Sequence, residues 1–538
     1  MPKKAPTKPV AFVSDENYVA LAGVFVEFES LETGEISVVQ SSPRGALYAA
    51  LASGKYRITL AKEGYGSKWV EGHIRTGEPL QLRLLADGLL AYMWPKWVRA
   101  GQYSEIRLHS VEQCQVTLWR YGLQKEYVQM ISWFDEHGPR SVMQITPDED
   151  FTQSGVNWNK HGYPTPHVQQ RVAAPFRSGL YYFWARTPSG RLFSFPWVVA
   201  PAQPKSRLAV LASTNTWNAY NNFGGRSNYI NPEGLPPAPT VNARLDLGRY
   251  TQAESVWRIQ DREFKPLSFD RPEPHNHIFD NSPWNSSGIT DPIGGRMQCG
   301  QAPAEWRLLG WLEREGHDYD YYAEAHLHDG TLPLEAYKVL VLSVHPEYWT
   351  REMYFKVKQW VLEQGGRLMY LGGNGLNCEV TFHDDGTMAC RSYDDSTDSG
   401  HESRMHRTVE SEANLLGVVF TYPGAMTAAP YRVMEESHWA FAGTGLKNGD
   451  LFGEETLHER VPGGASGHET DKVSASSPRN LQRLAKGTNS DEGGADLIYH
   501  ESGRGAVFSA GSITWVSALF TDPHISRITS NVLNRFLK

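Results

Sequence analysis

The stretch Val339-Leu-Val-Leu-Ser-Val-His-Pro-Glu-Tyr-Trp349 decides the fold class of this 538-residue chain. It begins as a run of apolar and β-branched residues of strand length, breaks at a polar turn with a proline, and is followed by a helical pattern over 351–364. Open α/β sheets carry their chemistry where buried strands end in polar loops, because the carboxyl ends of the strands form a crevice. His345 and Glu347 lie in such a loop and are the first candidate site residues.

Length and composition exclude several classes of protein. The chain is too long for one core, so about two to four domains are expected. A net charge of -8 argues against nucleic acid as a partner, and no apolar run is long enough to predict a membrane span. Four scattered cysteines form no disulfide framework and the basic start of the chain lacks an apolar signal region, so we expect a cytoplasmic protein. The 17 tryptophans and 25 tyrosines favour β-sandwich cores and assembly into a homo-oligomer.

Two β-rich segments come first in the chain. Short alternating strands separated by Gly and Ser turns predict a small β-sandwich over 1–87, and its hairpin around Gly54 resembles carboxypeptidase-regulatory-like modules. Aromatic-rich strands predict an immunoglobulin-like β-sandwich over 88–204. A polar, irregular excursion is expected within it, between Asp135 and Ala174.

The pattern of secondary-structure signals changes after the proline-containing linker at 201–206. Strands then alternate with helical patterns, which predicts βαβ units around a parallel sheet over 205–538. Irregular insertions are expected at about 230–300 and 376–500. The predicted fold class is therefore multidomain, with two β-sandwich modules followed by an α/β domain.

Three predicted strand ends carry polar clusters, at 214–229, 345–349 and 372–375. In a doubly wound sheet these ends converge on one crevice. Taken singly, each cluster has a simpler interpretation: tyrosines are usually phenols bonded to backbone, a glutamate after a strand often caps a helix, and Gly-Gly-Asn-Gly is a tight turn. The residue types alone leave both interpretations open.

The motifs of the C-terminal segment resemble the N,N-dimethylformamidase large (beta) subunit family, whose members are iron-dependent amide hydrolases. They occur in the family's order and are Thr216-Trp-Asn-Ala-Tyr220-Asn, Ser227-Asn-Tyr229, Arg271-Pro272, 337–349 and 366–375. The resemblance implies a glutamine-amidotransferase-like (flavodoxin-like) sheet, although no cysteine stands at a nucleophile elbow.

The resemblance implies a mononuclear Fe3+ held by Tyr220, Tyr229 and Glu347. Two phenolates and one carboxylate are hard anionic oxygens whose charges match a ferric ion. A trivalent cation also depresses the pKa of a phenol far below about 10. The spacing departs from the family, because only eight residues separate the two tyrosines here and the long insertion follows them.

The resemblance further implies three catalytic residues, His345, Asn374 and Arg391. The expected reaction is metal-assisted hydrolysis of a small or N-substituted amide, in which the iron polarises the carbonyl and lowers the pKa of water. His345 then moves a proton or orients the water, and Asn374 donates to the developing oxyanion. Which amide is cleaved, and whether a small partner subunit is required, stay open.

Two rival interpretations remain at this stage. A non-catalytic binding or scaffold protein with an amidotransferase-like fold would pack the same residues without a metal. Oxidative chemistry at the metal is disfavoured because no facial set with two histidines is present. The pairs His275/His277 and His326/His328 have spacings that could bind a metal, but no third ligand accompanies either pair, so surface histidines are expected.

Overall fold

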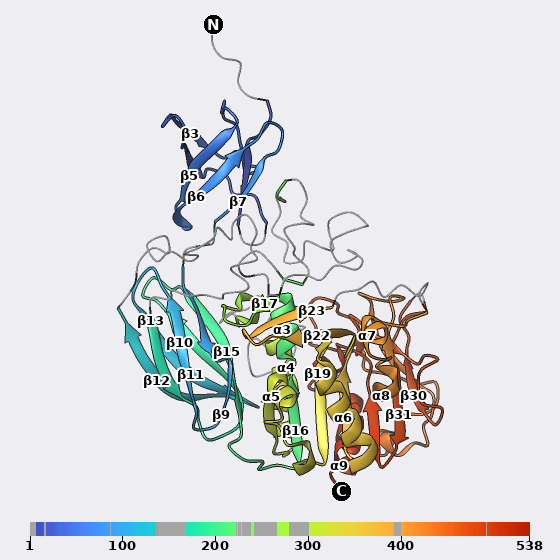
Figure 1. The fold of residues 1–538 in the computed structure, drawn as a ribbon. Helices are drawn as coiled ribbons and strands as arrows, with labels where there is room; N and C mark the ends of the chain where they lie inside the picture. The colour runs from blue at the N-terminus through green and yellow to red at the C-terminus, as the bar shows by residue number, and fades with distance from the viewer. Residues whose placement is uncertain are drawn as a thin grey trace.

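The computed structural model describes residues 7–15, 18–84, 88–135, 168–221, 266–278, 301–391, 400–490 and 492–538, together with the short pieces 86, 137, 223, 227–228 and 238–240 (Figure 1). The described chain forms two β-rich parts and one part in which helices cover a large sheet. The predicted boundaries at residues 87 and 204 stay predictions.

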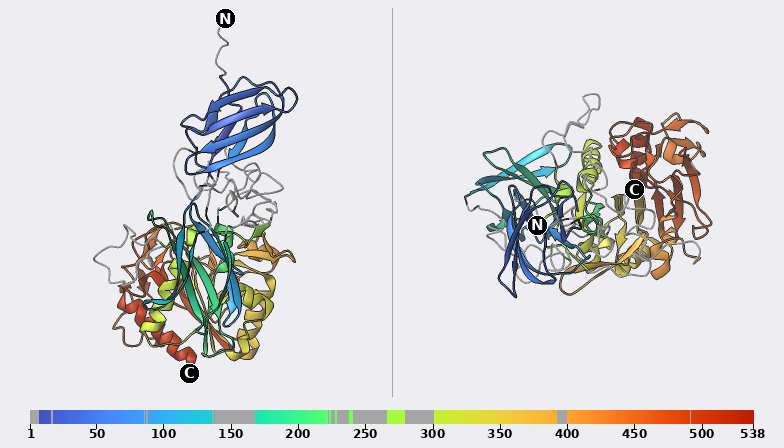
Figure 2. Two further views of the ribbon diagram at one scale, coloured as in Figure 1. Left: turned by 90° about the vertical axis from the view of Figure 1, so that its left-hand side faces the viewer. Right: turned by 90° about the horizontal axis from the view of Figure 1, so that it is seen from above.

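Two sheets from the start of the chain lie at one end of the molecule (Figures 1 and 2), in the orders β4-β1-β7 and β3-β2-β5-β6. Alternate residues of β5, namely Tyr56, Ile58 and Leu60, are buried between the sheets, because successive side chains of a strand point to opposite faces. The strands are β1 (Ala11–Ser14), β2 (Phe25–Ser30), β3 (Ile36–Gln40), β4 (Ala46–Leu47), β5 (Gly54–Lys62), β6 (Gly66–Ile74) and β7 (Leu80–Arg83).

The next two sheets share one buried cluster and therefore pack face to face as a sandwich. Their strand orders are β13-β10-β8 and β12-β11-β14-β15-β9. Ile106 and Leu108 from the first sheet meet Val116, Leu118 and Phe183 from the second in this cluster. The strands are β8 (Leu90–Trp94), β9 (Trp97–Arg99), β10 (Tyr103–His109), β11 (Cys114–Tyr121), β12 (Lys125–Phe134), β13 (Val168–Ala173), β14 (Gly179–Arg186) and β15 (Leu192–Ala200).

A nine-stranded sheet organises the rest of the described chain, in the order β18-β16-β19-β21-β32-β31-β30-β26-β27. The pairings from β18 to β32 are parallel, and those from β32 to β27 are antiparallel. The strands are β16 (Leu208–Ala212), β18 (Asp320–Ala323), β19 (Val339–Val344), β21 (Arg367–Gly372), β26 (Tyr431–Val433), β27 (Leu451–Phe452), β30 (Gln482–Gly487), β31 (Asp496–Ser502) and β32 (Gly505–Ser509). The predicted strand at 339–344 is confirmed, and it is buried on both faces.

Helices cover both faces of this sheet. Val339 and Val341 of β19 enter the core shared with α4 (Ala302–Arg314) and α9 (Pro523–Leu537). The alternate residues Leu340 and Leu342 enter the core shared with α5 (Glu324–Asp329) and α6 (Arg351–Gln364). A strand between two helical layers must be apolar on both faces, which explains the unbroken apolar run at 339–342. The predicted helix over 351–364 is confirmed with the same bounds.

The segment 376–500 is not simply irregular, as the sequence suggested, because four strands of the main sheet, β26, β27, β30 and β31, lie in it. A small sheet in the order β17-β23-β22-β20 lies beside the main one. The remaining elements are α3 (Thr214–Tyr220), β17 (Leu267–Ser268), η5 (Pro274–Asn276), η6 (Leu334–Ala336), β20 (Tyr348–Trp349), β22 (Cys378–Phe382), β23 (Thr387–Cys390), α7 (Arg404–Thr408), α8 (Ala413–Leu416), β24 (Val419–Phe420), β25 (Ala428–Ala429), η8 (Trp439–Phe441), β28 (Ser466–Gly467), β29 (Asp471–Lys472) and η9 (Trp515–Ala518). No helix in the described part of the chain has the length and apolar character needed to cross a membrane.

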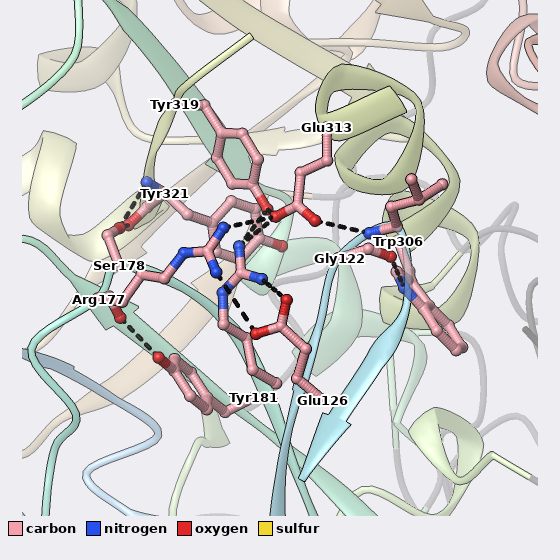
Figure 3. Close-up of polar contacts among 11 residues, drawn as sticks. Gly122, Glu126, Arg177, Ser178, Tyr181, Trp306, Glu313, Tyr319 and Tyr321 are labelled. Atoms are coloured by element: carbon pink, nitrogen blue, oxygen red, sulfur yellow. Dashed lines mark hydrogen bonds and ion pairs between the residues drawn. The ribbon is translucent and has the colours of Figure 1, made fainter. Parts of the chain in front are cut away.

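A buried polar cluster joins the sandwich of β8–β15 to α4 (Figure 3). The Arg120 guanidinium of β11 forms an ion pair with Glu313 of α4, and Glu313 Oε2 accepts a hydrogen bond from Leu123 N at 2.7 Å. Burial opposes ionisation of Glu313, but the contacts with Arg120 outweigh burial and lower its pKa. Nearby, Trp306 Nε1 donates to Gly122 O at 2.9 Å. The sandwich and the nine-stranded sheet are therefore fastened through polar groups that are largely shielded from water.

Replacing Glu313 with Gln should lower the free energy of unfolding by about 2–3 kcal/mol, because the buried Arg120 guanidinium loses the less exposed of its two carboxylate partners and keeps only Glu126. Urea denaturation followed by tryptophan fluorescence measures the change. Glu78→Gln is the matched control, since its ion pair with Arg75 is mostly exposed and should change stability by less than about 0.5 kcal/mol. Equal effects of the two substitutions would contradict this account of the interface.

Candidate active site

Tyr220 and Glu347 meet where two neighbouring parallel strands end. Tyr220 is the last residue of α3, which follows β16, and Glu347 lies in the loop that follows β19. The order β18-β16-β19 means that the chain passes to opposite sides of β16, and a crevice opens at such a reversal of strand order. Tyr220 Oη donates a hydrogen bond to Glu347 Oε2 at 3.0 Å. Two residues predicted from separate strand ends are thus in direct contact.

Two buried carboxyl groups hold the beginning of α3. Ser213 N donates to Glu305 Oε1 at 3.1 Å, and Asn215 N donates to Glu324 Oε2 at 2.7 Å. Burial raises the pKa of Glu305 to about 8 and the pKa of Glu324 well above its ordinary value. In the next turn the Thr216 hydroxyl accepts a hydrogen bond from the backbone N–H of Glu347 at 3.1 Å. The helix that carries Tyr220 is therefore fixed directly against the loop that carries Glu347.

Arg271 holds the other end of α3. Its side chain is completely buried, and Nη2 donates to Asn218 O at 3.0 Å while Nη1 donates to Phe223 O at 2.8 Å. Asn221 Nδ2, just beyond the helix, donates to Pro272 O at 2.8 Å. A cation is favourable at a helix C-terminus, where backbone carbonyls lack intrahelical partners. The Arg-Pro pair singled out from the sequence thus fixes the end of the helix that carries Tyr220.

The sandwich of β8–β15 fastens the Arg-Pro segment from behind. Lys96 Nζ donates to Arg271 O at 2.7 Å and forms an ion pair with Glu273 Oε1 at 2.6 Å. Tyr92 Oη donates to Asp270 Oδ1 at 2.6 Å, and Arg107 forms an ion pair with the same oxygen. Contacts therefore run without a break from the sandwich through residues 270–273 to the helix of Tyr220.

His345 lies between two carboxylates. Its Nε2 is 3.2 Å from Glu347 Oε2 and 3.1 Å from Glu469 Oε2. Burial alone lowers the pKa of His345, but the Glu469 and Glu347 carboxylates outweigh burial and raise it to about 10. The same contact lowers the pKa of Glu469, although burial opposes its ionisation. At neutral pH the geometry therefore holds an imidazolium against two carboxylates.

Asn374 reaches this cluster through Glu469. Its backbone has φ 51°, in the left-handed region, and its backbone N–H donates to Asp471 Oδ1 at 2.8 Å. A Cβ on the preceding residue, Gly373, would clash with the Glu469 carbonyl, so only glycine allows this close approach. From this turn Asn374 Nδ2 donates to Glu469 Oε2 at 2.9 Å. Asn374, Glu469 and His345 thus form one chain of contacts that ends on Glu347.

Arg404 supplies a second cation to Glu347. Its Nη2 donates to Glu347 Oε1 at 2.9 Å, and its Nε donates to Asn377 Oδ1 at 3.0 Å.

Ser403, which caps α7, donates through its hydroxyl to the fully buried Glu412 at 2.5 Å. Burial raises the pKa of Glu412 to about 8, although the Ser403 hydrogen bond opposes that rise.

The other predicted site residues are placed differently. Tyr229 lies outside the described residues, but the preceding Asn228 is anchored, with its backbone N–H donating to Ala219 O at 2.8 Å and Nδ2 donating to Tyr348 Oη at 2.8 Å. The structure does not bring Arg391 together with Tyr220 or Glu347: within the described chain its ion pair is with Glu379, at 3.7 Å.

Glu469 and Arg404 were not found from the sequence. They lie far from His345 and Glu347 in sequence, within 376–500, and no spacing pattern links them to the strand end. The one local feature that marks Glu469 is the glycine two residues before it, in the segment Gly467-His-Glu469 between the short strands β28 and β29. A pattern of this kind is too common to identify a site.

The four histidines of the two pairs noted in the sequence, at 275/277 and 326/328, differ in their surroundings. The expectation that they lie on the surface was wrong for His326, which is buried and whose Nδ1 accepts a hydrogen bond from Ala323 N at 3.2 Å, inside the first turn of α5. His277 accepts a hydrogen bond from Ser194 N at 2.8 Å. Among the residues that the structure describes, no three His, Cys, Asp or Glu side chains form a group arranged to hold a metal ion. Tyrosine oxygens are not among these side chains and are a further class of metal ligand.

The sequence is similar to known proteins along most of its length. The profile of the family described as N,N-dimethylformamidase beta subunit-like, C-terminal, matches residues 116–527. The N,N-dimethylformamidase beta subunit of Paracoccus aminophilus is 24% identical over 506 residues, which covers 78% of this chain and 62% of that protein. The beta subunit from Alcaligenes sp is 28% identical over 290 residues, covering 44% of this chain and 37% of that protein. The chain therefore spans less than two thirds of each of these relatives.

Solved structures resemble the chain only remotely. The Bacteroides ovatus glucan-utilisation protein SGBP-B, solved with a mixed-linkage heptasaccharide, is 11% identical, covers 37% of this chain and 46% of its own, and has a TM-score of 0.14. Murine CEACAM1b is 10% identical, covers 36% of this chain and 98% of its own, and has a TM-score of 0.12. Scores this low carry no argument about fold or function.

Replacing Glu412 with Gln should flatten the dependence of stability on pH. The folded chain binds the Glu412 proton up to about pH 8, whereas an ordinary glutamate loses it near 4.5, so the wild type loses stability as pH rises between these values. Between pH 5 and pH 8 we expect the variant to lose less stability than the wild type, by on the order of 3 kcal/mol. Urea denaturation at the two pH values measures this.

The exposed Glu78 gives the matched control for this experiment, because Glu78→Gln changes the same functional group in water. Its profile should follow the wild type. A Glu412→Gln profile as steep as that of the wild type would contradict a protonated carboxyl beside Ser403.

Proposed function

We propose that this chain, which belongs to the N,N-dimethylformamidase beta subunit-like family, is an iron-dependent hydrolase of a small or N-substituted linear amide. The family profile agrees with the resemblance found in the motifs; it begins inside the sandwich, at residue 116, and extends through the sheet that carries the site. The activity, the substrate and the need for a small partner subunit belong to the proposal, because the relatives are longer than the part that matches. A homo-oligomer and a cytoplasmic location stay predictions.

The observation that carries the proposal is the contact of Tyr220 Oη with Glu347 Oε2 at the crevice beside β16 and β19. A phenol that donates to a carboxylate places two hard oxygen donors side by side, and such donors suit a ferric ion once the phenol has lost its proton. Tyr229 would be the third donor. The anchoring of Asn228 to Ala219 and Tyr348, next to the end of α3, supports this assignment.

The donor set therefore fits a ferric ion. Tyr220, Tyr229 and Glu347 would hold it, and the bound ion would supply a Lewis acid that polarises the amide carbonyl and lowers the pKa of water. Three anionic oxygens would balance its charge. Glu347 is buried and Tyr220 partly buried, and low polarity strengthens the attraction between cation and ligands.

The neighbouring residues are suited to move protons during hydrolysis. In the proposal Glu469, whose carboxylate lies 3.1 Å from His345 Nε2, accepts a proton from the attacking water. His345 carries a proton on Nε2 and can give it to the departing amine, after which the proton on Glu469 returns to His345 across their 3.1 Å contact. Asn374 Nδ2 orients Glu469 and has a second N–H, which in the proposal donates to the developing oxyanion. Water and the amide thus become a carboxylic acid and an amine.

The order of the five parallel strands supports the finer part of the fold prediction. Taken in chain order, β16, β18, β19, β21 and β32 lie in the arrangement 2-1-3-4-5, which is the flavodoxin-like order. Its reversal lies between the strands that carry Tyr220 and Glu347. We assign the domain to the flavodoxin-like, glutamine-amidotransferase-like class on this basis.

Glu347→Gln and Tyr220→Phe should each remove iron and lower kcat/KM for amide hydrolysis by more than about 100-fold, because each removes an anionic oxygen donor. Elemental analysis measures the iron, and the broad visible absorption of ferric tyrosinate reports the phenolate. The matched control is Tyr354→Phe, a buried tyrosine on α6 that bonds Glu410 and should keep both iron and colour.

A folded wild-type protein that is colourless, free of iron and inactive on amides would instead favour the alternative, a non-catalytic binding or scaffold protein with this fold. Full iron retention by Glu347→Gln would also contradict the proposed ligand set.

A further inference from the structure

The two carboxylate oxygens of Glu347 have different partners. Oε1 accepts a hydrogen bond from Arg404 Nη2 at 2.9 Å, whereas Tyr220 Oη and His345 Nε2 lie 3.0 and 3.2 Å from Oε2. The Glu347 side chain is 1% exposed, so water does not compete for these positions. The carboxylate therefore presents one oxygen to Tyr220 and keeps the other turned away.

The backbone and side chain of Asn377 hold Arg404 in this orientation. Arg404 Nε donates to Asn377 Oδ1 at 3.0 Å, and the N–H of Met405 donates to Asn377 O at 2.7 Å. Ser403 caps the same short helix by accepting a hydrogen bond from His406 N at 3.0 Å. The guanidinium is planar, and its Nε and Nη2 donate to different acceptors, so the orientation of the plane is fixed. A lysine ammonium has no such plane and cannot be fixed in this way.

We infer that Arg404 is the positioning residue that makes Glu347 a one-oxygen ligand, through Oε2, and weakens its electron donation. This inference rests on the proposed function. A guanidinium on Oε1 draws electron density from the carboxylate, so a metal on Oε2 stays more Lewis acidic. Hydrogen bonds to a ligating carboxylate orient it and tune the metal in this way.

A simpler role for Arg404 is to neutralise a buried carboxylate. A buried charge requires a partner, and many buried ion pairs do no more than that. The two roles predict different results for Arg404→Lys, because lysine restores the charge but cannot reach both Asn377 Oδ1 and Glu347 Oε1 with a planar fork. The position of the visible absorption band therefore distinguishes orientation from neutralisation.

The experiment compares iron-loaded wild type with Arg404→Met and Arg404→Lys, with folding checked by circular dichroism. Without the guanidinium, Glu347 donates more strongly and raises the acceptor orbitals of the iron, so the tyrosinate band of both variants should move to shorter wavelength. The value of kcat/KM should fall by about 10- to 100-fold. The matched control is Arg351→Met, which removes a 3.1 Å contact with Glu379 and should leave the band in place.

The outcomes separate the inference from the proposed function. A wild type with no iron and no band overturns both. A wild type with the band, together with an unchanged band in Arg404→Met, overturns the inference and leaves the hydrolase proposal standing. A band fully restored by Arg404→Lys also overturns the inference, because charge alone would then account for the role of Arg404.

Discussion

The contact between Tyr220 and Glu347 depends on α3 being held at both ends. A helix of seven residues is not stable alone, since isolated helices shorter than about 12–15 residues are marginal in water. Glu305 and Glu324 bind its first backbone N–H groups, and Arg271 binds a carbonyl near its end. All three side chains are buried, so their hydrogen bonds are not weakened by competition with water. Tyr220 is thus positioned by two buried carboxyl groups and one guanidinium that take no part in the proposed chemistry.

The same constraint connects the sandwich to the sheet. Arg271 is itself fastened by Lys96 of the sandwich, while the Arg120–Glu313 contact joins the sandwich to α4. The family profile begins inside β11 and runs into α9, so it includes the later strands of the sandwich together with the nine-stranded sheet. The Arg120–Glu313 contact lies inside the matched range, whereas Lys96 precedes it.

The alternation of apolar strands and polar loops was enough to predict part of the site. The buried run at 339–344 identified a central strand, and its polar end identified His345 and Glu347. Tyr220 lies in the polar cluster after the preceding strand, but the family resemblance, and not the pattern, singled it out. Glu469 and Arg404 could not be found like this, since they approach through short segments with no apolar period, where only tertiary packing decides position. Arg391 was placed by its distance in sequence, and in the described chain it pairs with Glu379, so its catalytic role stays a prediction.

The distribution of charge limits how the site can accept a cation. Glu347 and Glu469 are carboxylates in a nearly dry environment, and each needs a partner, which Arg404 and His345 provide. Glu347 Oε2 contacts two groups that carry a proton, the Tyr220 phenol and the His345 imidazolium, and of these two the phenol is the proposed metal ligand. Metal binding to such a site releases protons, because phenolate and not phenol is the ligand. In the proposed enzyme, loading with iron is therefore coupled to deprotonation of Tyr220, and the two cations stay in place to keep the carboxylates paired.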